Sequence, residues 1–301
     1  METNQIQKQI SRTAAIFLAL LVTFLWSTSF IIIKWGLSEL PPLTYAGLRY
    51  VLAFFCLVPF AISKERINEI KSIDRKDLKK LIALGLLFYT FTQGTQFIGL
   101  SLLPAVTVSL ILNFTPLVVA VMGIFLLSEK PNLSQWGGVF LFLIGIILYF
   151  YPKDFSTNKI LGIAVMIIGV LANSGSAILG RHINRSAQFN PLTVTVISMG
   201  FGSIFILVAG LIFQGVPAIS ITTFLYLLWL AVVNTAFAFT LWNLSLQKLT
   251  AMESSIINGT MLIQIAILAW IFLNETISLN EGTGMMLAAL GAILVQIKRK
   301  T

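Results

Sequence analysis

Residues 125–129, FLLSE, and residues 271–275, IFLNE, read as two copies of one helix end, and this duplication decides the fold. Their glutamates, Glu129 and Glu275, stand 146 residues apart (275 minus 129), close to half of the 301-residue chain. The same offset joins Ala105 with Ala251, Ser109 with Ser255, Leu133 with Leu279, Gly138 with Gly284, and Gly145 with Gly291. The chain is therefore expected to contain two related units, residues 1–152 and 153–301.

The composition places both units in a membrane. Hydrophobic residues make up 57% of the chain and charged residues 10%, and the mean hydropathy is +0.92. A soluble domain carries about 25% charged residues and needs far more polar surface than this chain offers. Apolar runs long enough to span a bilayer recur along the whole length, which is typical of transmembrane helices.

Ten apolar segments, five in each unit, are expected to cross the membrane as helices. Proline residues lie at most of the turns between them. The fold class is therefore an all-α integral membrane protein with ten transmembrane helices. The segments are 14–37, 43–63, 79–101, 104–127, 134–151, 160–181, 191–213, 222–246, 250–273 and 280–297.

Positive charges set the orientation of these helices. Most Lys and Arg residues share a side with the N-terminus, whereas the loops of the opposite side hold only Lys153 and Lys159. The positive-inside rule predicts a multi-pass protein of the cytoplasmic membrane with both termini in the cytoplasm. The net charge of +9 follows this loop pattern and does not indicate a nucleic-acid partner. Because each unit has five helices, the second enters the membrane from the opposite side, and the units form inverted repeats.

Inverted repeats favour a transporter whose binding site lies near the membrane midplane and opens to either side in turn. Interrupted helices at matching positions mark such sites. Asn113 precedes Pro116 in one segment, and Asn258 precedes Gly259 at the matching place in the other unit. Proline and glycine are also common in membrane helices in general. The Asn at each break favours the functional interpretation.

Polar and aromatic residues on matching segments are the candidates for the substrate cavity. Tyr89, Gln93 and Gln96 share one helical face. The two amides are expected to face the bundle interior, where they either bond to other helices or bind substrate. Trp26 lies well inside its segment, which favours the interior over an interfacial belt. The further candidates are Ser29, Asn173, Thr235, Phe239, Trp242 and Asn243.

Two cations lie within apolar segments, where a charge is a functional hypothesis by default. Lys34 lies near the outer end of its segment, and snorkelling to the interface is the simpler explanation for it. Arg49 lies deeper, in TYAGLRYVLAFF, where it could pair with a substrate carboxylate or with carbonyl ends of helices. No carboxylate has a clear midplane position, so no proton relay is visible.

Glycines seven residues apart give segments 134–151 and 280–297 small-residue faces that allow close helix packing. A homodimer through these two segments is the alternative interpretation.

Three stretches carry a resemblance to a known family. They are WSTSFIIIKWGLSELPPLTYAGLRYVLAFF, FTPLVVAVMGIFLLSEKPNLSQWGGVFLFLIGIILY and its partial repeat FLNETISLNEGTGMMLAALGAILV. With these features the chain resembles the EamA-type exporters of the drug/metabolite transporter superfamily. The resemblance implies inverted five-helix repeats, scaffolding roles for segments 134–151 and 280–297, and export of small metabolites such as amino acids. Leu262 departs from the pattern, because it stands where the first unit has Pro116.

The predicted function is export of small neutral or zwitterionic metabolites by alternating access, with a small-molecule substrate and the lipid bilayer as partners. Efflux of lipophilic cationic drugs is the alternative, and the lack of a midplane carboxylate counts against it. A membrane enzyme would need acid–base, nucleophilic or metal-binding groups. The one histidine, His182, lies in a loop beside Arg181, so no catalytic, metal or cofactor site is expected.

Overall fold

The structure, a computed structural model, describes residues 11–127, 133–151, 156–185, 189–215, 218–246, 248–249 and 251–296. These residues form helices and no strand. Nine of the helices formed by this part of the chain are long and apolar enough to cross a membrane. A tenth apolar helix, whose apolar part is Leu279–Val295, is shorter than the others. The all-helical membrane fold is confirmed, and the count of ten spans stays a prediction.

The predicted segments end within about one helical turn of the observed helices. The predicted domain boundary at residue 152 lies outside the described residues. The helices of the first unit are α1 (Arg12–Gly36), α2 (Pro42–Ala61), α3 (Lys64–Lys71), α4 (Arg75–Gly85), η1 (Leu86–Thr92), α5 (Gln93–Leu102), α6 (Ala105–Leu112), α7 (Thr115–Leu127) and α8 (Leu133–Phe150).

The helices of the second unit follow the same pattern. From α4 onward most of them begin 146 residues after a helix of the first unit, as Leu279 follows Leu133. The bounds are α9 (Thr157–Arg185), α10 (Pro191–Phe213), α11 (Ile221–Ala231), η2 (Val232–Phe237), α12 (Ala238–Leu246), α13 (Ala251–Gly259), α14 (Met261–Leu273) and α15 (Leu279–Gln296).

Two pairs of spans, one member from each unit, are interrupted at matching places. The predicted break at Asn113 separates α6 from α7, and the predicted break at Gly259 separates α13 from α14. In addition, η1 and η2 are π-helical segments inside otherwise continuous spans. The sequence gives no sign of these π-helical turns, because neither contains proline or glycine. Such turns often accompany functional sites.

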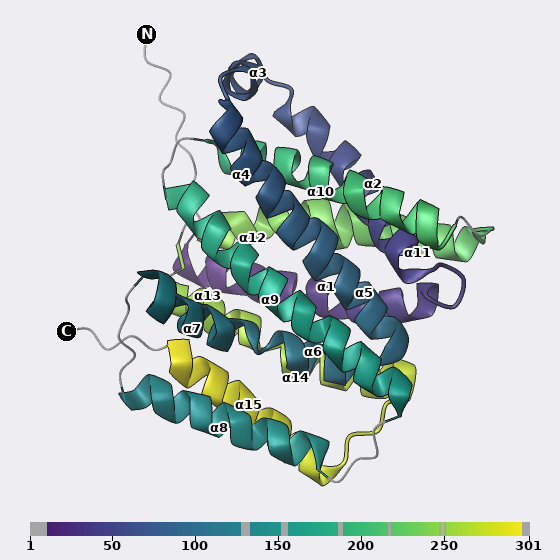
Figure 1. Cartoon of the computed structure of the whole chain (residues 1–301), viewed down its shortest axis with the longest axis vertical. Helices are drawn as coiled ribbons and strands as arrows, with labels where there is room; N and C mark the ends of the chain where they lie inside the picture. The colour runs from purple at the N-terminus through teal and green to yellow at the C-terminus, as the bar shows by residue number, and fades with distance from the viewer. Residues whose placement is uncertain are drawn as a thin grey trace.

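The glycine faces of α8 and α15 pack against each other, and the two helices lie side by side along one edge of the molecule (Figure 1). A Cβ atom added at Gly138 would lie 2.8 Å from the Gly291 carbonyl oxygen, and one added at Gly145 would lie 2.5 Å from that of Gly284. The early part of one helix thus meets the late part of the other, so they run antiparallel. This confirms the packing interpretation of the glycines. These small-residue faces are occupied within the chain, and the homodimer through these two helices stays a prediction.

Two carboxylates in loops accept hydrogen bonds from helix N-termini. Glu275 accepts hydrogen bonds from the backbone N–H groups of Ala105 and Val106 at the start of α6. Glu39 does the same at the start of α11, where it accepts from the backbone N–H and the hydroxyl of Ser220. An anion at a helix N-terminus is favoured by the helix dipole. Glu275 thus contacts a helix of the other unit, and Glu129 lies outside the described residues.

Candidate substrate site

An aromatic cluster lies between α1 and α12. The Trp26 ring lies 5.4 Å from the Phe239 ring and 5.2 Å from the Trp242 ring, centroid to centroid. Phe88 of η1 extends the cluster, because its ring lies 6.5 Å from that of Phe239. Trp26 is half-buried rather than exposed. Trp26 thus contacts two predicted residues of the second unit, Phe239 and Trp242, while its place in a substrate cavity stays a prediction.

A buried arginine lies on the neighbouring face. Arg49 is 4% exposed, and its Nε donates a hydrogen bond to the Thr235 hydroxyl at 3.1 Å. Thr235 in turn donates to the Leu230 carbonyl, five residues earlier, so the π-helical turn of η2 positions the hydroxyl. The guanidinium carbon lies 5.1 Å from the centroid of the Tyr50 ring. Arg49 is thus held by a hydroxyl and an aromatic face, without an ion pair to any described carboxylate.

Gln93 and Gln96 are buried, each at 9% exposure. Within the described part of the chain, neither amide side chain forms a hydrogen bond. Gly94 and Thr95, between them, face Ile206 of α10 and Gly169 of α9. The glutamines therefore point to the remaining side of α5, into the bundle. Of the two interpretations open from the sequence, bonding to other helices is not observed, and the amides remain available to a solute.

Ser29 and its neighbours on α1 are engaged by Asn234. The Asn234 amide nitrogen donates to the Leu25 carbonyl, to the Thr28 hydroxyl and to the Ser29 hydroxyl at 2.8 Å. Asn234 is fully buried, and its Oδ1 has no hydrogen-bond partner among the residues that the structure describes. Buried unpaired acceptors are uncommon in folded proteins, and such groups call for an explanation that includes function.

Four predicted residues form no hydrogen bond or ring contact with the described residues of this group. Asn113 donates its amide to the Ser109 carbonyl of its own helix, and Asn173 bonds to the Thr115 hydroxyl of α7. Asn258 is exposed and forms no hydrogen bond with the described residues. Lys34 lies at the end of α1, where it interacts electrostatically with Glu275. The side chain of Asn243 lies outside the described residues.

Sequence reasoning missed the aromatic residues that connect the arginine to the tryptophans. Tyr50 contacts Tyr89 at 5.4 Å between ring centroids, and Tyr89 contacts Phe88 at 4.9 Å. Only the position of Tyr50 beside Arg49 could have drawn attention to it. Nothing in the sequence distinguishes Phe88 from a phenylalanine that faces lipid.

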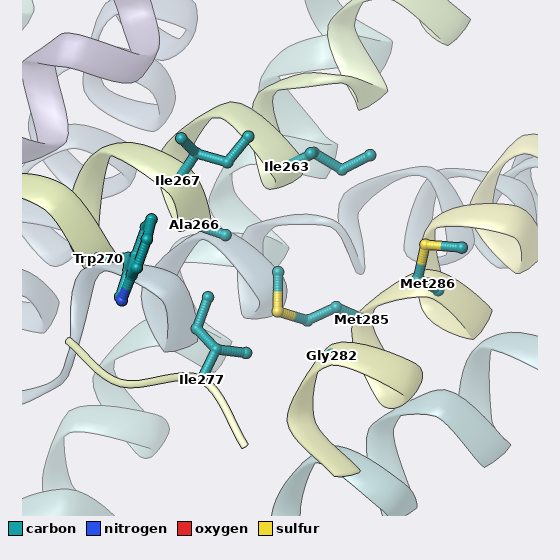
Figure 2. Close-up of a pocket in the computed structure, with 8 residues that line it drawn as sticks. All are labelled: Ile263, Ala266, Ile267, Trp270, Ile277, Gly282, Met285 and Met286. Carbon is teal, nitrogen blue, oxygen red and sulfur yellow. The ribbon is translucent and has the colours of Figure 1, made fainter. Parts of the chain in front are cut away.

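A hollow of about 320 Å³ lies elsewhere, between α14 and α15. Figure 2 shows Ile263, Ile267 and Trp270 of α14 on one side and Met285 and Met286 of α15 on the other. Trp270 is 62% exposed and Met286 is 61% exposed, as expected for side chains that face lipid tails. The hollow contains none of the predicted site residues and is lined mainly by apolar side chains.

The helices, the apolar exterior and the polar interior define a multi-pass membrane protein, and the comparison with protein families identifies its class as a transporter. The model of the "EamA-like transporter family" matches residues 13–151 and again residues 160–297. The chain belongs to the EamA-like transporter family. One match falls inside each of the two units expected from the sequence.

Curated relatives match over nearly the full length. The "uncharacterized transporter YoaV" of Bacillus subtilis is 24% identical, over 91% of this chain and 93% of its own. A "probable amino-acid metabolite efflux pump" of Salmonella typhimurium is 27% identical, over 93% of this chain and 91% of its own. A solved crystal structure superimposes with a TM-score of 0.68 at 16% identity, covering 95% of this chain and 98% of that one, which supports the fold alone.

Proposed function

We propose that this transporter exports small neutral or zwitterionic metabolites, with amino acids as the leading class. The observation that carries the proposal is the pair of glutamines, Gln93 and Gln96, each only 9% exposed, whose amides have no hydrogen-bond partner among the described residues. Burying a polar group without a partner is unfavourable. In a transporter, the solute can supply the missing hydrogen-bond partner, and the unpaired amides then favour its binding.

The surroundings of these amides suit an amino acid. The cluster of Trp26, Phe239 and Trp242 offers an apolar, aromatic surface for a side chain. Two curated relatives, from Salmonella typhimurium and Escherichia coli, carry the name "probable amino-acid metabolite efflux pump". Those names support the substrate class for this chain by analogy alone.

Alternating access between two inverted repeats is part of the proposal. Matching breaks at Asn113 and Gly259 and matching π-helical turns support two related units. In the proposed orientation both termini lie in the cytoplasm and the protein lies in the cytoplasmic membrane, as the loop charges suggest.

Efflux of lipophilic cationic drugs is the second candidate. A cationic solute would be stabilised by a buried carboxylate in the substrate path. The carboxylates of Glu39 and Glu275 lie at helix ends, where they accept hydrogen bonds from backbone N–H groups. The interior charge is instead the cation Arg49, which would repel a cationic drug.

The test is transport by the purified protein in lipid vesicles. We expect saturable uptake of at least one radiolabelled L-amino acid, competed by unlabelled amino acids and not by ethidium. Uptake of ethidium without any amino-acid transport would favour the second candidate and reject the first.

A further inference from the structure

We propose that Arg49 and Gln93 together form a subsite that binds the carboxylate of the transported solute. This inference deepens the proposed function and rests on it. It assigns to one place in the bundle the group that recognises the charged end of an amino acid.

Arg49 carries an unpaired charge in the interior of the bundle. Its Nε bonds to Thr235, and among the described residues its two terminal nitrogens have neither a hydrogen bond nor an ion pair. A guanidinium does not lose its proton inside proteins. A charge left unpaired within a membrane protein is costly and marks a functional position. The missing partner is an anion, and no described carboxylate supplies it.

Ring contacts between α2 and α5 place Gln93 at the level of Arg49. Tyr45 of α2 contacts Phe97 of α5, with ring centroids 5.3 Å apart. The two helices run antiparallel, because Tyr50, further along α2, contacts Tyr89, further back along the same span as α5. Four residues forward from Tyr45 is Arg49, and four residues back from Phe97 is Gln93.

The two side chains also face the same way. Arg49 follows Tyr45 by four residues and so lies on the face of α2 that Tyr45 presents to α5. Gln93 precedes Phe97 by four residues and lies on the face of α5 that Phe97 presents to α2. Each has free donors, the terminal nitrogens of Arg49 and the amide nitrogen of Gln93. Together they offer N–H groups to one anion.

The donor set fits a carboxylate better than a phosphate. A guanidinium binds a carboxylate through two parallel N–H···O bonds. A phosphate has more charge and is generally held by several cations, whereas Lys34, the second cation singled out from the sequence, lies at the end of α1 beside Glu275. The neutral amide of Gln93 adds a donor without adding charge.

The aromatic cluster then receives the rest of the solute. Trp242 lies seven residues beyond Thr235 along the same span, which corresponds to about 10 Å of helix. A molecule with its carboxylate at Arg49 and a ring directed along the span reaches Phe239 and Trp242. The subsite therefore predicts a preference for carboxylates with an aromatic or other bulky apolar side chain.

The experiment compares two probes that differ only at the carboxyl group. L-phenylalanine and L-phenylalaninamide are offered to vesicles that contain the wild type, R49Q, R49K, Q93A or the control K159Q, whose exposed lysine lies in the first turn of α9. We expect the wild type to transport the acid at least about 10-fold more efficiently than the amide. R49Q should lower kcat/KM for the acid about 100-fold and change that for the amide by about 2-fold or less, since charged hydrogen bonds of this strength are lost. R49K and Q93A should each lower kcat/KM for the acid about 10-fold, and K159Q should transport both probes as the wild type does.

Each other result has a defined meaning. Equal losses for acid and amide in R49Q and Q93A would assign Arg49 a structural role and overturn the subsite, while the proposed export function stands. Unchanged acid transport by these variants would also overturn the subsite and leave the proposed export function standing. If R49Q does not yield a folded protein, the acid-to-amide ratio of Q93A decides. Failure of the wild type to transport any amino acid would reject the proposed function, and the subsite with it.

Discussion

Glu275 accepts a hydrogen bond from the backbone N–H of Ala105 at 2.7 Å, and so ties the end of α14 to the first turn of α6. This contact fastens together two helices, one from each unit, that the sequence places 170 residues apart. The carboxylate satisfies N–H groups that a helix start otherwise leaves unpaired.

Removing this carboxylate should destabilise the fold. We expect E275A to lower the free energy of unfolding by about 1–2 kcal/mol, because it removes an anion from a helix N-terminus. E275Q should lose less, since an amide oxygen can still accept one of the bonds. Thermal unfolding in detergent measures both variants. E275A as stable as the wild type would show that the contact contributes little.

The seam between α8 and α15 offers a matched pair of glycines. A Cβ at Gly138 would lie 2.7 Å from the backbone nitrogen of Val295, whereas one at the adjacent Gly137 meets nothing within 4 Å. We expect G138A to cost about 1–3 kcal/mol through overpacking. G137A should be neutral or slightly stabilising, because alanine favours the helix. Equal unfolding temperatures for the two variants would contradict the close packing of the seam.

The aromatic cluster should determine the preference for bulky solutes. We expect W242A to raise the KM for L-phenylalanine about 10-fold, which corresponds to one aromatic contact of roughly 1.4 kcal/mol. The effect on L-alanine should be small, since its methyl group does not reach the rings. Trp229 on the same span is 50% exposed, so W229A is the control and should transport as the wild type does. A similar loss for both amino acids in W242A would indicate a general packing defect.

The contact of Glu39 with the start of α11 predicts a pH dependence. The hydrogen bond from the Ser220 hydroxyl, with a further one from Thr223, holds the pKa of the Glu39 carboxyl below its usual value of about 4.3. A lowered pKa contributes stability that is present above the usual pKa and lost as the pH falls through the lowered one. The wild type should therefore exceed E39Q in unfolding temperature at pH 7, and the difference should shrink below about pH 4. A difference that is constant from pH 7 to pH 3 would contradict this assignment.

The sequence predicts the helices well because the bilayer constrains them strongly. A span in lipid must be apolar, so the runs of hydrophobic residues coincide with α1, α10 and most other helices. The breaks were also predictable, because Pro116 and Gly259 weaken the helix where they stand. The π-helical turns η1 and η2 leave no trace in composition.

The partners of individual polar side chains could not be predicted in the same way. Asn113 and Asn258 look equivalent in the sequence, yet the first bonds to its own helix and the second is exposed. Arg49 was recognisable as an unusual charge, but its bond to Thr235 depends on how the π-helical turn rotates η2. A helix rotated by one residue presents a different face, and hydropathy does not fix this rotation between spans that are apolar on all sides.

The central claim is that the buried amides of α5 bind the transported solute. The direct measurement is counterflow of radiolabelled L-phenylalanine into vesicles preloaded with the unlabelled amino acid, for the wild type, the double variant Q93A/Q96A and N258A. We expect counterflow by the wild type and by N258A, whose exposed amide has no hydrogen bond to the described site residues, and at least about a 10-fold loss in Q93A/Q96A. Full counterflow by a folded Q93A/Q96A protein would contradict it.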